Sequence, residues 1–351
     1  MRRFWTPFVE PALKLLKPRI IVEIGADSGI NTKRILEFCQ ATAARCHIID
    51  PTGIRNRAEC AELLSQCGVL HERRSLEVLG ELGDADVYLI DGDHNWYTVY
   101  HELGAILTAA RAAGRKALPV MLFHDVLWPY GRRDLYYCLT DVPAEFRQPS
   151  QVAGLLLGQS RAVPDFGINA DLEHALDEGG PRNGVLTAIE DFVAENEGLY
   201  ELLLVPGFHG LGMLLPRTGL PAATRKGLAA LFSLSEAARG HLEAVEEDRL
   251  KAAATGFQLY QELKRERERE REQERERERL EAALAQSCAE AAAHAAQLNA
   301  LEHRYHLITA SHSYRALRRA KRLFGRLLPE GSKREHVLHQ ALKTLLPSRS
   351  H

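Results

Sequence analysis

Ile20-Ile-Val-Glu-Ile-Gly-Ala-Asp-Ser-Gly29 is the stretch that decides the fold. Its first five residues form a β-branched apolar run, which is typical of a buried strand. Gly25 and Gly29 then allow a sharp backbone turn and a close approach to a ligand. Their spacing is G-x-x-x-G, not the G-x-G-x-x-G of dinucleotide-binding folds. The stretch therefore predicts a strand followed by a binding turn, without identifying the ligand.

Strands and helices alternate through the first 215 residues. We expect strands at 20–24, 46–50, 69–73, 87–91 and 120–125, and helices at 32–43, 57–66, 97–112 and 186–193. This alternation implies βαβ crossovers and a parallel sheet covered by helices on both faces. Two closing strands, at 200–205 and 211–215, are joined by a short turn and predict an antiparallel pair at the sheet edge. The expected fold class is α/β, with a Rossmann-like, seven-stranded, mostly parallel sheet, an antiparallel edge strand and a C-terminal helical extension.

The chain divides into three predicted parts. Residues 1–217 form the α/β domain, with an insert at about 143–184 where Gly, Pro and polar residues interrupt the periodicity. Residues 218–304 form a charged, coiled-coil-like helical segment, in which the Arg/Glu run 264–279 lacks the apolar seam of a coiled coil. Residues 305–351 form a basic amphipathic tail. Within the middle part, a stripe at three- and four-residue steps favours a homo-oligomer: Leu280, Leu284, Ala291, Ala295, Leu298 and Leu301.

Charge is distributed unevenly along the chain. The net charge is −2, so the total gives no reason to expect a nucleic-acid partner. From residue 305 to 351, ten Lys and Arg stand against two Asp and Glu, which leaves +8 in the tail. Between residues 314 and 328, apolar Leu317, Phe324, Leu327 and Leu328 lie among six basic residues. This pattern indicates peripheral contact with an anionic membrane, and a solvated basic helix is the alternative.

Other features point to a cytoplasmic protein. No run of 18 apolar residues predicts a membrane-spanning helix. Pro7, Glu10 and Pro11 interrupt the start of the chain, which is therefore not expected to be a signal peptide. The six cysteines form no C-x-x-C pair, so we expect reduced thiols and no structural zinc site.

Polar side chains end several of the predicted strands, where ligands bind in open α/β sheets. Asp50 ends the second strand and is placed to accept hydrogen bonds from ribose hydroxyls. The fourth strand ends in Asp91-Gly-Asp-His94 and the fifth in His124-Asp125. If these strands lie beside the first, their carboxylates and imidazoles converge as ligands for a divalent metal. The alternative is that Asp93 and His94 only cap the following helix.

In this order, the motifs resemble the class I S-adenosylmethionine (SAM)-dependent methyltransferases. The resemblance rests on Glu23-Ile-Gly-Ala-Asp-Ser-Gly29, Ile49-Asp-Pro51, Leu89-Ile-Asp-Gly-Asp-His-Asn-Trp-Tyr97 and Phe123-His-Asp125. More narrowly, they look like the metal-dependent branch that contains macrocin O-methyltransferase and the cephalosporin-hydroxylase-like proteins. The resemblance covers residues 4–216, and it implies a SAM-dependent methyltransferase domain over residues 1–217.

The resemblance implies a role for each matching residue. Gly25 and Gly29 would face the methionine part of SAM, Asp50 its ribose, and Ser75 and Leu76 its adenine. The full set of expected cofactor-binding residues is Glu23, Gly25, Asp27, Gly29, Asp50, Ser75 and Asp91. A divalent metal, expected to be Mg²⁺, would be bound by Asp91, His124 and Asp125, and His94 would be the catalytic base. His124 stands where that branch often has glutamate.

These roles predict metal-assisted O-methyl transfer. SAM gives up its methyl group by direct displacement, so the enzyme must align the acceptor and make its hydroxyl nucleophilic. The aromatic and arginine side chains of Trp128-Pro-Tyr-Gly-Arg-Arg-Asp-Leu-Tyr-Tyr137 suit a sugar or glycan acceptor. Two alternatives stay open: an iron oxygenase that uses His94, His124 and one aspartate, and a non-catalytic platform for a helical assembly. His209, in the turn between the closing strands, is expected to be structural.

Overall fold

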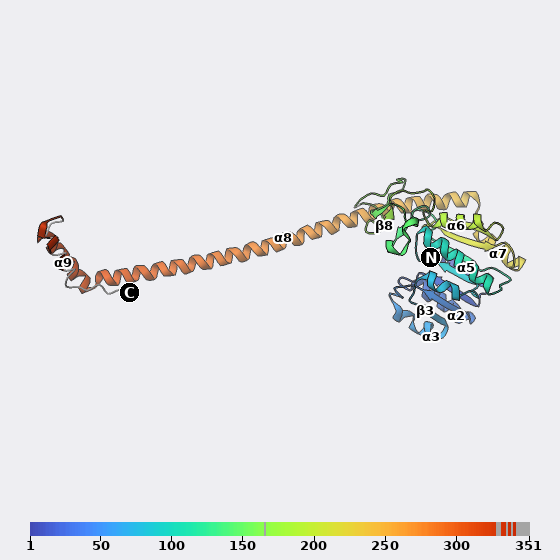
Figure 1. The fold of residues 1–351 in the computed structure, drawn as a ribbon, viewed down its shortest axis with the longest axis horizontal. Helices are drawn as coiled ribbons and strands as arrows, with labels where there is room; N and C mark the ends of the chain where they lie inside the picture. Colours follow the sequence, from blue (N-terminus) through green and yellow to red (C-terminus); the bar gives the residue numbers. More distant parts are fainter. Residues whose placement is uncertain (165, 328–330, 335, 338–339, 342–351) are drawn as a thin grey trace. The chain divides into compact units, whose positions relative to one another are not determined.

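The chain folds into two compact units. The computed structural model describes residues 1–351 except 165, 328–330, 335, 338–339 and 342–351 (Figure 1). The first unit covers Met1–Leu263 and the second Lys264–His351. The first unit contains the sheet and its covering helices. The second is helical throughout most of its described part.

The sheet has seven strands in the order β3-β2-β1-β4-β5-β10-β9. Their bounds are β1 Ile20–Ile24, β2 Arg45–Ile49, β3 Gly68–His71, β4 Val87–Ile90, β5 Val120–His124, β9 Tyr200–Val205 and β10 Leu211–Pro216. The pairs from β3 through β5 are parallel, and β10 is antiparallel to both β5 and β9. The predicted fold class is confirmed. The antiparallel strand β10 lies one place inside the sheet, and β9 is the edge strand.

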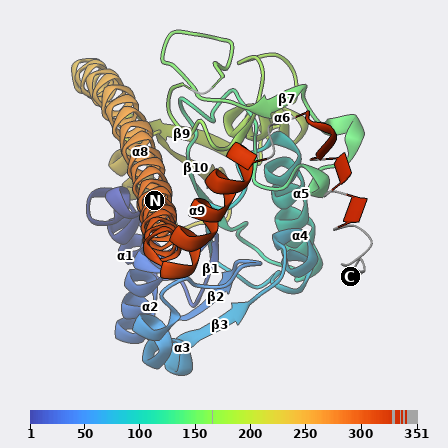
Figure 2. The same ribbon diagram turned by 90° about the vertical axis from the view of Figure 1, so that its left-hand side faces the viewer.

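Two apolar cores lie on opposite faces of this sheet, with their helices visible on either side of it in Figure 2. Strand residues alternate between the cores: Val22 of β1 belongs to one and Ile21 to the other, as the two-residue period of a strand requires. One core is covered by α5 (Trp96–Ala112) and α6 (Val185–Glu195). The other is covered by α1 (Glu10–Leu16), α2 (Ile30–Thr42) and α7 (Ala222–Phe232). The helix expected at 57–66 is a short 3₁₀ turn, Arg57–Cys60, followed by α3 (Ala61–Cys67).

The insert is more ordered than its sequence indicates. It contributes β7 (Ser150–Val152) and β8 (Glu173–Ala175) to a three-stranded antiparallel sheet in the order β6-β8-β7, and β6 (Leu135–Tyr136) precedes the insert. Strands of two or three residues are too short for hydrophobic periodicity to reveal. Asp134 joins this insert to the main sheet, because its buried carboxylate accepts hydrogen bonds from the backbone N–H of Trp96 and of Gly184, both at 2.7 Å. It also accepts one from the Tyr136 hydroxyl at 2.8 Å.

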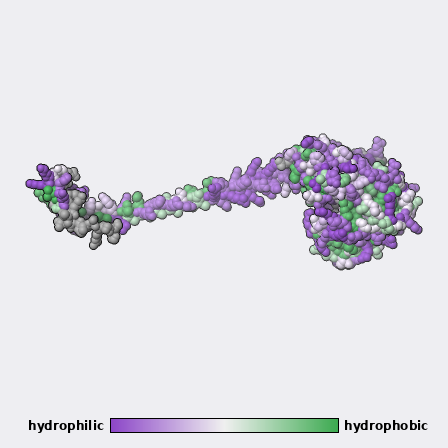
Figure 3. Space-filling model, in the orientation of Figure 1, coloured by the Kyte–Doolittle hydropathy of each residue, from purple (hydrophilic) through white to green (hydrophobic). Residues whose placement is uncertain are grey.

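After the sheet, the chain is helical. The first unit takes in α7 and the start of α8 (Glu236–Ala310). Residues 264–279 of α8 are all exposed, and this part of the helix is strongly hydrophilic in Figure 3. The apolar stripe that begins at Leu280 is exposed as well. Self-association through this stripe stays a prediction, as does the three-part division of the chain. Helix α9 (His312–Leu327) follows.

No helix in the described part of the chain is long and apolar enough to cross a membrane. The six cysteines all lie among described residues, and all are free thiols. The cytoplasmic location stays a prediction.

We predict that Asp134 is a main stabiliser of the insert. Asp134→Ala leaves three buried donors without their acceptor, and each such loss costs about 1–3 kcal/mol. We expect the free energy of unfolding to fall by at least about 3 kcal/mol in urea titrations. Asp134→Asn keeps one carbonyl oxygen for the two backbone donors, so its loss should be less than half as large. Equal stability of the wild type and the alanine variant would contradict this role.

Candidate active site

The expected site residues meet where the carboxyl ends of β1, β4 and β5 lie side by side. The register pairs Ile24 with Ile90 and Ile90 with Phe123. The residues that follow these positions therefore converge at one edge of the sheet. They surround a cavity of about 560 Å³. Six of the predicted site residues line it, namely Gly25, Asp27, Asp91, His94, His124 and Asp125, whereas Glu23, Gly29, Asp50 and Ser75 do not.

The turn after β1 requires glycine for two reasons. Gly25 has a φ of +87°, and a Cβ atom on it would lie 2.2 Å from the carbonyl oxygen of Asp91. Gly29 has a φ of +78°, and a Cβ atom there would lie 2.6 Å from Cγ2 of Ile54. Both positions demand a backbone conformation that other residues rarely adopt. The turn thereby lies directly against the Asp91 backbone.

Asp50 holds this turn in place through hydrogen bonds to its backbone. One carboxylate oxygen accepts hydrogen bonds from the backbone N–H of Ala26 at 2.9 Å and of Asp27 at 3.2 Å. The other accepts from the backbone N–H and the hydroxyl of Thr52, at 2.9 and 2.7 Å. The side chain is thus already engaged by four donors of the chain itself. Contact with a ribose stays a prediction.

The other expected cofactor residues differ in their surroundings. Glu23 is buried and accepts a hydrogen bond from Asn31, while its second oxygen has no partner. Burial raises the pKa of Glu23 to about 7, although Thr32 and Asn31 oppose the shift. Asp27 is exposed and paired with Arg55. Ser75 is buried at the start of α4 (Ser75–Val78).

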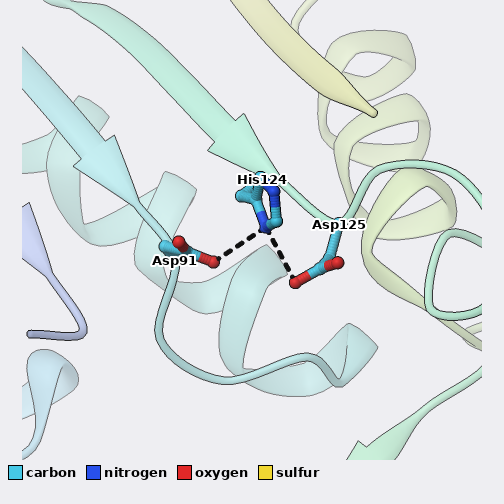
Figure 4. Close-up of side chains that lie close together, drawn as sticks. All are labelled: Asp91, His124 and Asp125. Carbon is cyan, nitrogen blue, oxygen red and sulfur yellow. Dashed lines mark hydrogen bonds and ion pairs between the residues drawn. The ribbon is translucent and has the colours of Figure 1, made fainter. Parts of the chain in front are cut away.

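Asp91, His124 and Asp125 form a tight cluster (Figure 4). His124 Nδ1 lies 3.2 Å from Oδ1 of Asp91 and 3.0 Å from Oδ2 of Asp125. One ligand atom from each of the three residues can be chosen so that all lie within 4.8 Å of one another. His94 completes the group, with Nε2 2.7 Å from Oδ2 of Asp125. The predicted convergence of these four side chains is therefore present.

Charge pairing dominates this cluster. Burial alone would lower the pKa of His94, but Asp125 and Asp91 raise it to about 10. The same two carboxylates raise the pKa of His124 to about 9 against the effect of its burial. In return, the histidines hold the pKa of both aspartates below the usual range, although burial opposes this. The amino group of Met1 adds a further positive charge, 2.6 Å from Asp91.

His94 is free to act on a ligand because its neighbour provides the helix cap. The Asn95 side chain accepts a hydrogen bond from the Thr98 N–H at 2.8 Å and so caps α5. His94 is buried, with Nε2 2.7 Å from Oδ2 of Asp125, whereas its Nδ1 has no hydrogen-bond partner. The capping alternative for His94 is thus not the arrangement observed.

The backbone at Asp125 is also unusual. Its φ of +58° lies in the left-handed region, which a non-glycine residue adopts at a cost of about 1–3 kcal/mol. Such strain persists where the surrounding structure determines the conformation, often at functional sites. Here it directs the carboxylate toward both histidines.

Several residues of the cavity wall were not identified from the sequence. They include Arg3, Phe208 and Arg249. The guanidinium groups of Arg3 and Arg249 lie 4.5 and 5.4 Å from the centre of the Phe208 ring. No local motif marks these positions, because they come from the first turn of the chain, the β9–β10 turn and α8. Only the fold brings them together.

His209 both supports the structure and lines the cavity. Its Nδ1 lies 2.9 Å from the Trp128 carbonyl oxygen, and its Nε2 lies 3.2 Å from Arg249. Its backbone N–H donates to Glu246 of α8 at 2.9 Å. The start of α8 is therefore connected to the cavity wall through the β9–β10 turn.

In the aromatic and arginine-rich segment after β5, residues 128–137, some side chains pack in the interior, whereas Tyr137 lines the cavity. Arg133 is buried and donates to backbone carbonyl groups of the insert, and Tyr136 is buried beside Asp134. Tyr137 is 59% exposed and lines the cavity, with its ring 5.9 Å from that of His94. Of these three, only Tyr137 is available to a ligand.

Comparison with known proteins agrees with this geometry. Residues 22–126 match a family model described as a methyltransferase domain. The matched region runs from β1 to the end of the His124-Asp125 motif. Residues 22–126 are thus similar to methyltransferase domains, in agreement with the prediction from the sequence. The narrower resemblance to the macrocin O-methyltransferase branch stays a prediction.

Two solved structures are similar to this chain. The Podospora anserina methyltransferase PaMTH1 with bound S-adenosylhomocysteine is 19% identical over 61% of this chain and 77% of its own, with a TM-score of 0.37. The Burkholderia thailandensis 1,6-didemethyltoxoflavin-N1-methyltransferase is 15% identical over 61% and 80%, with a TM-score of 0.30. These scores are too low to carry an argument about function. No curated protein matches the sequence.

We predict that the β1 turn is needed for SAM binding. Gly25→Ala forces a Cβ atom against the Asp91 backbone, so we expect SAM affinity in calorimetry to fall by more than about tenfold, equivalent to roughly 1.4 kcal/mol. Gly104→Ala is the matched control, because a Cβ atom at Gly104 in α5 meets nothing within 4 Å. It should keep SAM affinity and melt at the same or a higher temperature. Unchanged SAM affinity in Gly25→Ala would disprove the assignment.

Proposed function

We propose that this protein transfers the methyl group of SAM to a hydroxyl of a sugar or glycan, with help from a divalent cation. The observation that carries this proposal is the largely buried cluster of Asp91, His94, His124 and Asp125 beside the Gly25 turn. A methyl transfer to nitrogen or to a thiolate has no need for such a cluster. A hydroxyl is a weak acid, and such a cluster would help to deprotonate it.

The donor set fits a divalent cation. Asp91 and Asp125 offer carboxylate oxygens, which Mg²⁺ and Mn²⁺ prefer, and His124 offers an imidazole nitrogen. In the chain alone, the charge of the two carboxylates is balanced by protons on the histidines and by the Met1 amino group. A divalent cation bound there would supply that charge, polarise the acceptor hydroxyl and lower its pKa.

His94 is the proposed general base. It lies next to the same carboxylates, with Nε2 2.7 Å from Asp125, and its Nδ1 is buried without a hydrogen-bond partner. An unpaired buried nitrogen is costly unless a ligand satisfies it. Once a bound cation has replaced the proton on its ring, His94 would accept the hydroxyl proton as the bond to the methyl carbon forms, and the neighbouring carboxylates would stabilise the resulting imidazolium.

The remaining cavity residues align the two substrates. The Gly25 turn presents its backbone to the methionine part of SAM, and the acceptor enters beside His94. Methyl transfer proceeds by in-line displacement, so the chain contributes orientation rather than a nucleophile. The ring centroid of Tyr137, which lines the cavity, lies 5.9 Å from that of His94. Aromatic faces at this position suit the apolar face of a sugar ring.

We predict that the cluster binds Mn²⁺, which can be followed by electron paramagnetic resonance. Asp125→Asn removes a ligand charge, so we expect its Mn²⁺ affinity to fall by more than about tenfold. Asp248→Asn, an exposed substitution on α8, is the matched control and should bind Mn²⁺ like the wild type. Equal Mn²⁺ affinity in Asp125→Asn and the wild type would contradict the assigned metal site.

We also predict that His94→Asn lowers turnover but leaves the binding of SAM and Mn²⁺ nearly unchanged. With tritiated SAM, Mg²⁺ and a panel of saccharides, kcat should fall by about 10²–10⁴-fold, while SAM and Mn²⁺ affinities stay within about threefold. His294→Asn, an exposed histidine on α8, is the matched control. Products should be methyl ethers. Transfer to nitrogen only, transfer unaffected by chelators, or hydroxylation with iron and 2-oxoglutarate would overturn the proposal.

A further inference from the structure

Helix α9 separates apolar and basic side chains along its whole length. With 3.6 residues per turn, side chains three, four, seven and eleven positions apart share one face. Ala316, Ala320, Leu323 and Leu327 follow this spacing and form one apolar face. The rest of the circumference carries six basic residues and no acidic one: Arg315, Arg318, Arg319, Lys321, Arg322 and Arg326.

The apolar face of α9 is exposed. The side chains of Leu317, Leu323 and Leu327 are 70%, 60% and 67% accessible. Leu317 lies at the border of the face, and Leu323 and Leu327 lie near its middle. Leu328 and the side chain of Phe324, which the sequence also placed here, lie outside the described part of the structure. Large leucines at this exposure are unfavourable in water unless another surface covers them.

The charge pattern of α9 indicates which kind of surface would cover its apolar face. A helix exposed to water on all sides usually carries both acidic and basic residues, as residues 264–279 of α8 do. Helix α9 carries basic residues alone. Basic side chains around an apolar face place guanidinium groups at the level of anionic headgroups while the leucines enter the acyl boundary.

We propose that α9 lies on the surface of anionic lipid membranes and holds the enzyme there. The helix lies in the plane of the membrane, because its 16 residues include six charges and cannot span a bilayer. Leu323 and Leu327 enter the acyl boundary, and the arginines contact lipid phosphates. This inference is independent of the cavity chemistry and does not depend on the proposed acceptor.

Vesicle flotation of the full-length protein tests the inference. We expect binding to vesicles of phosphatidylcholine with about 30% phosphatidylserine, weak binding to pure phosphatidylcholine, and release as NaCl rises from about 0.05 to 0.5 M. Leu323→Glu should weaken binding to anionic vesicles by more than about tenfold. Leu259→Glu is the matched control, because Leu259 is a similarly exposed leucine of α8, outside α9, and this variant should bind like the wild type.

A charge-changing variant separates the two contributions. Arg319→Gln combined with Arg322→Gln should also weaken anionic-vesicle binding and flatten its salt dependence. The proposal is overturned if the wild type does not bind anionic vesicles, or if it binds neutral ones equally well. It is also overturned if Leu323→Glu binds like the wild type. If the protein bound single-stranded RNA more tightly than vesicles, and Leu323→Glu left RNA binding unchanged, α9 would instead be a nucleic-acid-binding helix.

Discussion

The close approach of the β1 turn to the end of β4 is the constraint on which the site depends. Gly25 lies so near Asp91 that a Cβ atom would fall 2.2 Å from its carbonyl oxygen. Parallel pairing of β1 with β4 and of β4 with β5 fixes this approach, and it also places His124 and Asp125 beside Asp91. The turn for SAM and the acidic cluster are thus two consequences of one strand register. A change in that register would separate both.

Electrostatics give the cluster its chemical character. The neighbouring carboxylates of Asp125, which is buried, and Asp91, which is partly buried, repel each other and lose hydration, so they require positive charge nearby. His94 and His124 supply it in the chain alone, at the cost of holding their protons firmly. In the proposed function, a divalent cation would take over this role from the histidines. The Nδ1 of His94 is buried without a hydrogen-bond partner, which is costly by itself, and in the proposed reaction an acceptor hydroxyl would bind beside this ring.

Sequence patterns predicted the sheet and the central cluster because both depend on local signals. The apolar runs of β1, β4 and β5 are strong, and polar residues follow each of them directly. The same reasoning did not reveal that four donors of the chain already engage Asp50, because these contacts depend on the exact shape of the turn. Arg249 and Phe208 were not predicted as cavity residues, because only tertiary packing brings them to the cavity. The small sheet of the insert has strands too short to show a period.

The central claim is that Asp91, His124 and Asp125 hold a divalent cation next to the SAM site. A crystal structure with S-adenosylhomocysteine and Mn²⁺, with data collected for the anomalous signal of manganese, tests it most directly. The account predicts a single strong anomalous peak within bonding distance of side-chain oxygens of Asp91 and Asp125. The sulfur of S-adenosylhomocysteine should lie in the same cavity, and His94 should face the open coordination positions of the metal. Bound S-adenosylhomocysteine with no anomalous peak at these residues under saturating Mn²⁺ would contradict it.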